Sequence, residues 1–355
     1  MANIHDVARL AGVSIATVSR VLNATATVNP EAAERVRAAA HALDYRPNHA
    51  AKALRANRTR IIGLLITDIQ NPFFTALIRG VEDVTQREGY SLILCNSDEN
   101  PRKERHYIEV LRAEQVAGAI IVPTREHQRA AQLFRDQGIP LVAVDRRLDD
   151  QHTDAVLVDN ARGAREAVEH LIGNGFRRIG VITGPQNTTT GRERLLGYRQ
   201  ALQVAGILHD PGIERIGSFK EECGKRLAEE LLALTPRIDA LFVANNLLTL
   251  GALEALHARG LRIPDDIAVV GFDEMPWAAL SAVSLTTVTQ PVYDLGSTAA
   301  VRLFQHLHHL GTFTRQEIIL APTLSIRGSS RAVGRGPGAT VTTGSPVFGP
   351  GPVAL

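Results

Sequence analysis

From residue 60 to about residue 328, short aliphatic runs alternate with helix-like segments, and this alternation restricts the possible folds more than any other feature of the chain. The runs fall at residues 61–66, 91–95, 118–122, 141–144, 155–158, 179–183, 240–243 and 268–272. They are rich in valine, isoleucine and leucine throughout, which is typical of parallel strands buried on both faces. Repeated strand–helix units predict a doubly wound α/β fold, and because this stretch is too long for one comfortable core, we expect two α/β lobes.

The first 46 residues follow a different pattern, that of three short helices. Apolar residues share one face of a first helix that ends at Gly12, and Ser14 is a good N-cap for a second helix that reaches Asn23. Pro30 suits the first turn of a third helix, over residues 31–43. Two helices joined by a tight glycine-containing turn and braced by a third form the helix-turn-helix pattern. We therefore expect a DNA-binding domain at residues 1–46.

The charge distribution separates the same two regions. Residues 1–60 contain nine Lys and Arg against four Asp and Glu, a net charge of +5, while the rest of the chain contains 30 against 33, a net charge of −3. A basic head on a slightly acidic body favours a module that binds a polyanion, joined to a body with another task. Charge alone fits chance clustering on a solvated surface equally well.

Two segments lack a core of their own. In the linker at residues 47–59, Pro47 interrupts the chain and the alanine-rich stretch that follows is too short to form a stable isolated helix. We expect this linker to become helical only when a partner holds it. The tail at residues 329–355 contains six glycines and four prolines and cannot bury enough surface to offset its ordering entropy. We expect the tail to be disordered and assign it no function.

Several features restrict the class of protein. The longest aliphatic runs are far shorter than the roughly 20 residues that cross a bilayer, and the first residues show no secretory signal pattern. Cys95 and Cys223 are the only cysteines, which favours a soluble protein of a reducing compartment, the cytoplasm. The chain has no Gly-x-Ser-x-Gly, His-Glu-x-x-His, Walker A or Gly-x-Gly-x-x-Gly motif, and His308 and His309 have no spaced carboxylate or cysteine partner. We therefore expect no enzyme, no metal site and no cofactor.

The second helix of a helix-turn-helix lies in the major groove, and its first residues reach base edges. In this chain those residues are Ile15, Ala16 and Thr17, with Arg20 one turn further on. Arginine can bind guanine O6 and N7 with two hydrogen bonds, whereas isoleucine and alanine contact thymine methyls or exclude bases. The polar side chains suited to phosphate oxygens are Ser14, Thr17, Ser19 and Asn23. An alternative places Ile15 in the apolar core of the domain.

Five short motifs carry a specific resemblance. They are residues 4–8 (IHDVA), 11–14 (AGVS), 17–23 (TVSRVLN), 45–48 (YRPN) and 51–54 (AKAL), and they resemble the lac repressor family of bacterial transcription regulators. The resemblance extends over about residues 2–328. It implies a homodimer or dimer of dimers on a near-palindromic, double-stranded operator. It also implies a hinge helix that folds on DNA, with Asn48 and Ala53 at the DNA and Leu54 wedged into the minor groove. Alternatively, Leu54 packs on the body.

The body then resembles a type I periplasmic sugar-binding protein, whose lobes close around a ligand at the carboxyl ends of the strands. Polar and aromatic residues follow the predicted strands of this chain. They resemble the ribose-contacting set of the ribose-binding branch, namely Asn71, Phe73, Phe74, Asp145, Arg146, Arg194, Phe219, Asn245, Asp273 and Gln290. Carboxylates, amides and guanidinium groups can bind sugar hydroxyls, and phenylalanine rings can pack on the C–H faces of a small ring. We therefore expect D-ribose or a related pentose as effector.

Individual members of this set also suit purely structural roles. Phe73 and Phe74 suit a core, Asp145 and Arg146 suit a surface ion pair, and Asp273 suits a helix cap. The chain also departs from the family after Asn245, where the family usually has Asp and this chain has Asn246, a change that affects lobe packing or pocket charge.

Three alternatives to a sugar-released repressor remain. The effector of the same regulator could be another sugar or a purine co-repressor. The body could be a sugar-binding transport component, which requires export, or a carbohydrate enzyme fused to a DNA-binding head.

Overall fold

The computed structural model describes residues 3–23, 28–45, 59–125, 130–276, 278–279, 283–308 and 314–331. Of the predicted linker at residues 47–59, only Thr59 is among them; its backbone N–H and its hydroxyl both donate to the carbonyl of Gln115. Asn48, Ala53 and Leu54 lie outside the described residues, so the predicted hinge helix stays a prediction.

Three helices form the head: α1 (Ile4–Ala11), α2 (Ile15–Asn23) and α3 (Pro30–Ala42). The side chain of Asn3 caps α1, and Gly12 ends it in the left-handed region with φ 63°, a conformation that glycine adopts without steric cost. Val7, Val18 and Val36 are fully buried where the three helices meet. The predicted helix-turn-helix is therefore confirmed, with a third helix that completes its small core.

The first lobe is a six-stranded parallel sheet in the order β11-β5-β4-β3-β1-β2. Its strands are β1 (Ile61–Ile66), β2 (Ser91–Asn96), β3 (Gly118–Ile121), β4 (Leu141–Val144), β5 (Asp154–Val158) and β11 (Glu317–Leu320). One face is covered by α5 (Pro72–Arg87) and α12 (Val292–His308), the other by α6 (Pro101–Ala113) and α7 (Ala130–Arg135). Helices α5 and α12 approach so closely that a Cβ at Gly80 would lie 2.2 Å from the Tyr293 carbonyl oxygen.

The second lobe repeats this architecture with the sheet order β12-β10-β9-β8-β6-β7. Its strands are β6 (Ile179–Thr183), β7 (Glu214–Ile216), β8 (Ala240–Val243), β9 (Ala268–Phe272), β10 (Thr286–Thr289) and β12 (Thr323–Ser325), and only β12 is antiparallel to its neighbour. Helices α8 (Asn160–Gly173) and α9 (Thr189–Val204) cover one face, while α10 (Glu221–Leu232) and α11 (Asn246–Ala258) cover the other.

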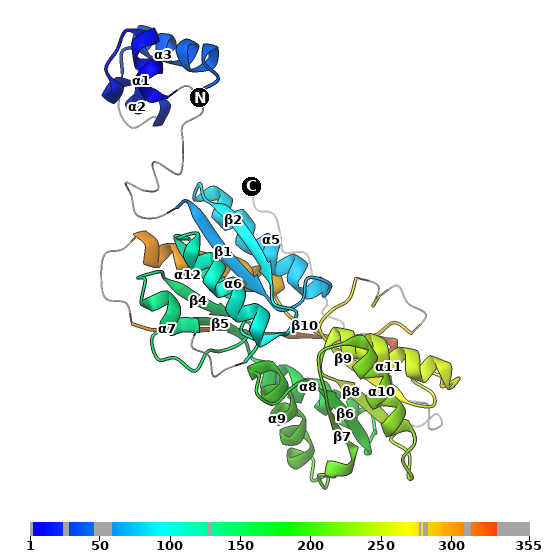
Figure 1. Cartoon of the computed structure of the whole chain (residues 1–355). Coiled ribbons are helices and arrows are strands. Elements are labelled where there is room, and N and C mark those ends of the chain that lie inside the picture. The colour runs from blue at the N-terminus through cyan, green and yellow to red at the C-terminus, as the bar shows by residue number, and fades with distance from the viewer. Residues whose placement is uncertain are drawn as a thin grey trace, which may run out of the picture.

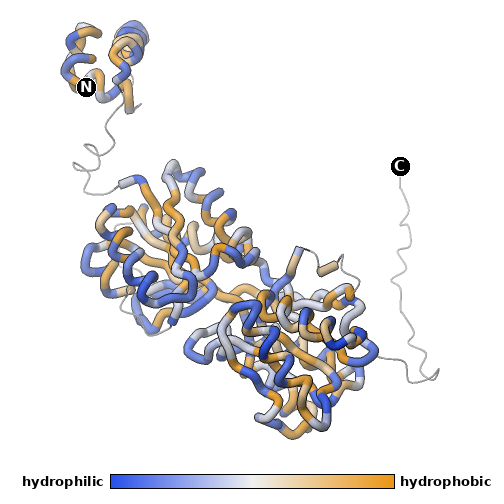
Figure 2. Tube along the Cα trace, turned by 45° about the vertical axis from the view of Figure 1, so that its right-hand side comes forward, coloured by the Kyte–Doolittle hydropathy of each residue, from blue (hydrophilic) through white to orange (hydrophobic). Residues whose placement is uncertain are grey.

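The two lobes lie side by side and share one chain that crosses between them three times (Figure 1). The crossings fall between β5 and α8, between β10 and α12, and between β11 and β12. Apolar residues concentrate inside each lobe, as the orange segments of Figure 2 show. The predicted pair of α/β lobes is confirmed, because the fully buried runs such as β3, β4 and β9 form the central strands of both sheets.

The predicted boundary of the tail at residue 329 is wrong by a few residues. Residues Gly328–Ser330 form a short 3-10 helix, and both Ser329 and Ser330 are fully buried. The Ser329 hydroxyl donates to the Val269 carbonyl at 2.6 Å and accepts from the Thr286 N–H at 2.8 Å. These bonds attach the segment Gly328–Ser330 to β9 and β10, a role that composition alone did not predict. Residues 332–355 lie outside the described residues.

Candidate functional site

The start of α2 presents an exposed surface. Ile15 is 41% exposed, and Ala16 and Arg20 are exposed beside it, whereas Val18 on the opposite side of the helix is fully buried. The alternative that placed Ile15 in the core is therefore wrong. The residues predicted to reach base edges at this position are therefore accessible to a partner.

Hydrogen bonds fix the first turn of α2. The Ser14 hydroxyl accepts from the Thr17 N–H at 3.2 Å and shares a second hydrogen bond with the Thr17 hydroxyl at 2.9 Å. Ser14 is exposed, and Thr17 and Ser19 are half-buried. The side chain of Asn23 lies outside the described residues.

A cavity lies between the two lobes at the carboxyl ends of their strands. The space between its side chains, including the part open to solvent, is about 360 Å³. The ten predicted effector-binding residues all line it, namely Asn71, Phe73, Phe74, Asp145, Arg146, Arg194, Phe219, Asn245, Asp273 and Gln290. They come from both sheets, because parallel strands bring all their carboxyl ends to one edge.

Three aromatic rings form the apolar part of the cavity. Phe73 and Phe74 begin α5 and meet edge to face, with ring centroids 5.1 Å apart and planes at 88°. Both are more than nine-tenths buried and also belong to the core of the first lobe, so the two residues serve the core and the cavity at once. Phe219, from the loop after β7, supplies the third ring from the second lobe.

Two buried carboxylates face the cavity from left-handed backbone positions. Asp145 follows β4 with φ 66° and Asp273 follows β9 with φ 76°, conformations that are strained for these residues and typical of functional sites. Burial raises the pKa of Asp145 to about 6, although Arg146 beside it acts in the opposite direction. Asp273 accepts from Gln290 and contacts Asn245. The described residues after Asp273 begin no helix, so it is not a cap.

Two buried arginines balance these carboxylates. Arg194 donates to the Asn160 side chain and to the Ala244 carbonyl, both at 2.8 Å, and lies 3.6 Å from Asp273. Arg146 is 4% exposed, so the alternative of a surface ion pair with Asp145 is wrong. Both guanidinium groups are held by several partners from the protein itself.

Three further residues that the sequence did not single out line the cavity: Asp68, Glu99 and Thr190. Thr190 lies one helical turn before Arg194, a spacing that places both side chains on one face of α9. The Thr190 hydroxyl, Arg146 Nε and Gln290 Oε1 are buried with no hydrogen-bond partner among the described residues. Because buried polar atoms normally find partners, these three atoms are suited to a hydroxylated ligand.

Polar contacts join the lobes beside the cavity. Asn71 Nδ2 donates to Asn246 Oδ1 at 3.1 Å, and Asn246 Nδ2 donates to Asn71 Oδ1 at 2.7 Å. Lys220 of the second lobe donates to Asp68 at 2.7 Å and to Asp98 at 3.0 Å, both in the first lobe. The departure at Asn246 thus acts on lobe packing, one of the two effects expected for it.

The described part of the chain shows neither a metal-binding cluster nor a membrane-spanning helix. It contains no group of three His, Cys, Asp or Glu that could hold a metal ion. None of its helices is long and apolar enough to cross a membrane.

Comparison with known proteins agrees with this architecture. Residues 3–48 match the family "Bacterial regulatory proteins, lacI family", and residues 59–325 match "Periplasmic binding proteins and sugar binding domain of LacI family". The chain is 38% identical to the ribose operon repressor of Halalkalibacterium halodurans, over 86% of this chain and 91% of that one. It is 35% identical to the HTH-type transcriptional repressor PurR of Aliivibrio salmonicida, over 87% and 94%.

Solved structures show the same likeness. The lac repressor dimer bound to operator and the anti-inducer ONPF matches with a TM-score of 0.82 at 27% identity, over 93% of this chain and 99% of that one. A LacI family transcriptional regulator from Enterococcus faecium with bound ribose matches with a TM-score of 0.69 at 29% identity, over 77% and 100%. With the helix-turn-helix head and the two-lobed body in one chain, this protein belongs to the lacI family of bacterial transcriptional repressors.

Proposed function

We propose that this repressor binds a near-palindromic operator through α2 and is controlled by an uncharged sugar, D-ribose or a related pentose, held between its two lobes. The convergence of ten polar and aromatic residues from both lobes on one cavity carries the proposal. Phenylalanine rings suit the apolar faces of a pyranose or furanose, and carboxylates, amides and guanidinium groups suit its hydroxyls. The likeness to a ribose operon repressor and to a LacI family regulator with bound ribose supports the choice of sugar.

In this proposal the sugar acts by drawing the lobes together. Closure shifts the first lobes of the dimer, the hinge helices at residues 47–59 lose their partner, and operator affinity falls. Such coupling is typically about 5–150-fold. On DNA, Arg20 reads a base, Ile15 and Ala16 contact or exclude bases, and Ser14, Thr17, Ser19 and Asn23 bind phosphates. Asn48, Ala53 and Leu54 contact the DNA from the hinge, and the working form is a homodimer or dimer of dimers in the cytoplasm.

One experiment tests the whole proposal. The operator is first obtained by selecting bound duplexes from a random pool, and its affinity is then measured with and without D-ribose at fixed salt concentration. We expect a palindromic site and a fall in affinity of at least fivefold with ribose. An unchanged affinity would rule out ribose as the effector, and no preference for any palindrome would rule out the regulator.

A purine co-repressor is a second candidate effector. The likeness to a PurR repressor favours it, and the aromatic rings of the cavity suit a flat base as well as a sugar ring. A thermal-shift screen with pentoses, hexoses and purines separates the two, because a ligand that binds only the folded protein raises its melting temperature. Stabilisation by purines alone would replace the sugar in the proposal.

A further inference from the structure

Glu99 is an acidic residue in the cavity that the proposed function does not use. It belongs to the turn between β2 and α6, where Asp98 and Glu99 both adopt left-handed backbone, with φ of 54° and 53°. Residues other than glycine adopt such a conformation rarely. The Glu99 N–H donates to the Thr67 carbonyl at 2.9 Å, and Lys220 holds the Asp98 side chain, so the turn is fixed at both residues.

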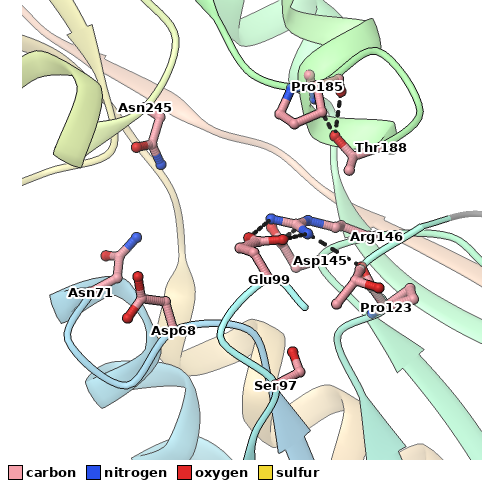
Figure 3. A network of polar contacts seen from close by, with 12 residues as sticks. Asp68, Asn71, Ser97, Glu99, Pro123, Asp145, Arg146, Pro185, Thr188 and Asn245 are labelled. Atoms are coloured by element: carbon pink, nitrogen blue, oxygen red, sulfur yellow. Dashed lines mark hydrogen bonds and ion pairs between the residues drawn. The ribbon is translucent and has the colours of Figure 1, made fainter. Parts of the chain in front are cut away.

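This turn places the Glu99 carboxylate against the fork of the Arg146 guanidinium. Arg146 Nη1 donates to Glu99 Oε2 at 2.9 Å and Nη2 donates to Oε1 at 2.7 Å, as the dashed lines in Figure 3 show. Nη1 also donates to the Pro123 carbonyl at 3.3 Å. Arg146 Cζ also lies over the Phe219 ring, 5.2 Å from its centre. Glu99 therefore occupies the two-pronged edge that would otherwise bind a carboxylate or phosphate.

The other arginine offers no substitute. Arg194 is committed to Asn160, to the Ala244 carbonyl and to the vicinity of Asp273. The cavity as a whole has four carboxylates, those of Asp68, Glu99, Asp145 and Asp273, against two guanidinium groups. An anionic ligand would meet an excess of negative charge and no arginine edge with both donors free, since Asp145 Oδ2 lies 3.6 Å from Arg146 Nε. The hydroxyls of an uncharged polyol can instead donate to the carboxylates.

We propose that Glu99 is a specificity-determining residue: by covering the Arg146 fork it excludes anionic ligands from the cavity and so selects uncharged polyols over sugar phosphates and sugar acids. This inference rests on the proposed function for the polyol, but the exclusion of anions does not depend on which polyol binds. Removing the carboxylate frees the fork and takes one negative charge from the cavity.

The experiment compares full-length wild type with E99A and the near-isosteric E99Q. Glu109→Gln, on the exposed side of α6, is the matched control for the lost charge. The probes are D-ribose, D-ribose 5-phosphate and inorganic phosphate, measured by calorimetry and thermal shift, with sodium chloride at equal ionic strength as the reference. Inorganic phosphate is smaller than a pentose, so exclusion by size cannot hide the effect.

We expect inorganic phosphate to raise the melting temperature of E99A in a saturable way. In wild type and E109Q it should raise the melting temperature no more than sodium chloride does. The ratio of D-ribose affinity to anion affinity should fall at least tenfold in E99A and by a smaller factor in E99Q, whose amide keeps one acceptor for Arg146. Binding of phosphate to wild type overturns the inference. So does an anion affinity of both Glu99 variants that stays within threefold of the wild-type value. If D-ribose binds to no variant but phosphate binds to E99A, the choice of effector fails and the role of Glu99 stands.

Discussion

The amide pair between Asn71 and Asn246 gives the sharpest prediction about the contact between the lobes. Asn246→Asp changes one atom, the side-chain nitrogen that donates to Asn71 Oδ1 at 2.7 Å, into a carboxylate oxygen. The reciprocal bond from Asn71 Nδ2 survives, but the first becomes a contact between two oxygens. Asn71 cannot relieve it by turning its amide over, because its Oδ1 also accepts from the Phe73 N–H at 2.9 Å and caps α5.

The net cost follows from these contacts. A lost hydrogen bond that leaves a buried polar atom without a partner costs about 1–3 kcal/mol; here that atom is the new carboxylate oxygen, since Asn71 Oδ1 keeps the Phe73 N–H. The new carboxylate regains about 0.3–1 kcal/mol, because residue 246 opens α11 and its side-chain oxygen accepts from the Leu247 N–H at 2.8 Å. The contact between the lobes is thus weakened by about 1–2 kcal/mol. If the lobes close on the sugar, its affinity falls about 5–30-fold.

Calorimetry with D-ribose at pH 8 and pH 5 measures this effect. At pH 8 we expect the full loss of affinity, and at pH 5 a partial recovery, because a protonated carboxyl can again donate to Asn71 Oδ1. Gln137→Glu, an exposed amide-to-acid change in the first lobe, is the control and should behave as wild type. Sugar affinity equal to wild type at pH 8 would refute the idea that this pair stabilises the ligand-bound arrangement.

Four other changes test other parts of the protein. Leu54→Ala should weaken operator binding far more than non-specific binding in a titration of both duplexes; equal losses would exclude a wedge. Arg20→Ala should relax the preference at one base pair per half-site by about 1–3 kcal/mol in a binding-site selection, and an unchanged preference would remove it from base reading. Asp273→Asn should lower sugar affinity at least about tenfold and leave operator binding intact, as gel shift would show. Burial raises the pKa of Glu104 to about 7, although the Thr124 N–H acts against it. Between about pH 4.5 and pH 7 the native protein therefore holds a proton on Glu104 that the unfolded chain releases, so the free energy of unfolding falls as pH rises through this range. Glu104→Gln should remove about 1–3 kcal/mol of this fall, as urea denaturation at several pH values would show. Identical pH dependence in both proteins would contradict the burial argument.

Much of the fold and the position of the cavity could be predicted because they depend on local pattern. Aliphatic runs such as Ile61–Ile66 and Ala268–Phe272 are buried on both faces, and a sheet of parallel strands brings every residue that follows a strand to one edge. Asp145 and Asp273 could be placed in the cavity on that ground alone, although they lie 128 positions apart in the chain. The resemblance then identified which of the residues at that edge share one ligand.

The remaining features depend on contacts that pattern does not encode. Glu99 reaches Arg146 because two consecutive residues adopt left-handed backbone, and the segment Ser-Asp-Glu-Asn does not predict this conformation. The partner of Asn246 lies 175 residues earlier, in the other lobe. Thr190 could have been found, since it lies four residues before Arg194 at the start of a helix that follows a strand.

The two lobes build the cavity with the same local geometry. In the first lobe Asp145 donates its N–H to the Val156 carbonyl of the next strand at 2.9 Å, and in the second lobe Asp273 does the same with Val288, also at 2.9 Å. Each lobe thus places one buried carboxylate at the cavity, and while burial is the main cause of the raised pKa of Asp145, the charge of Asp273 adds to it. Two like charges oppose the approach of the lobes unless donors lie between them, and Arg146 and Arg194 supply part of that compensation. In the proposed function, an uncharged polyol with hydroxyls on both sides of its ring supplies further donors, which would give ligand binding a direct electrostatic means of drawing the lobes together.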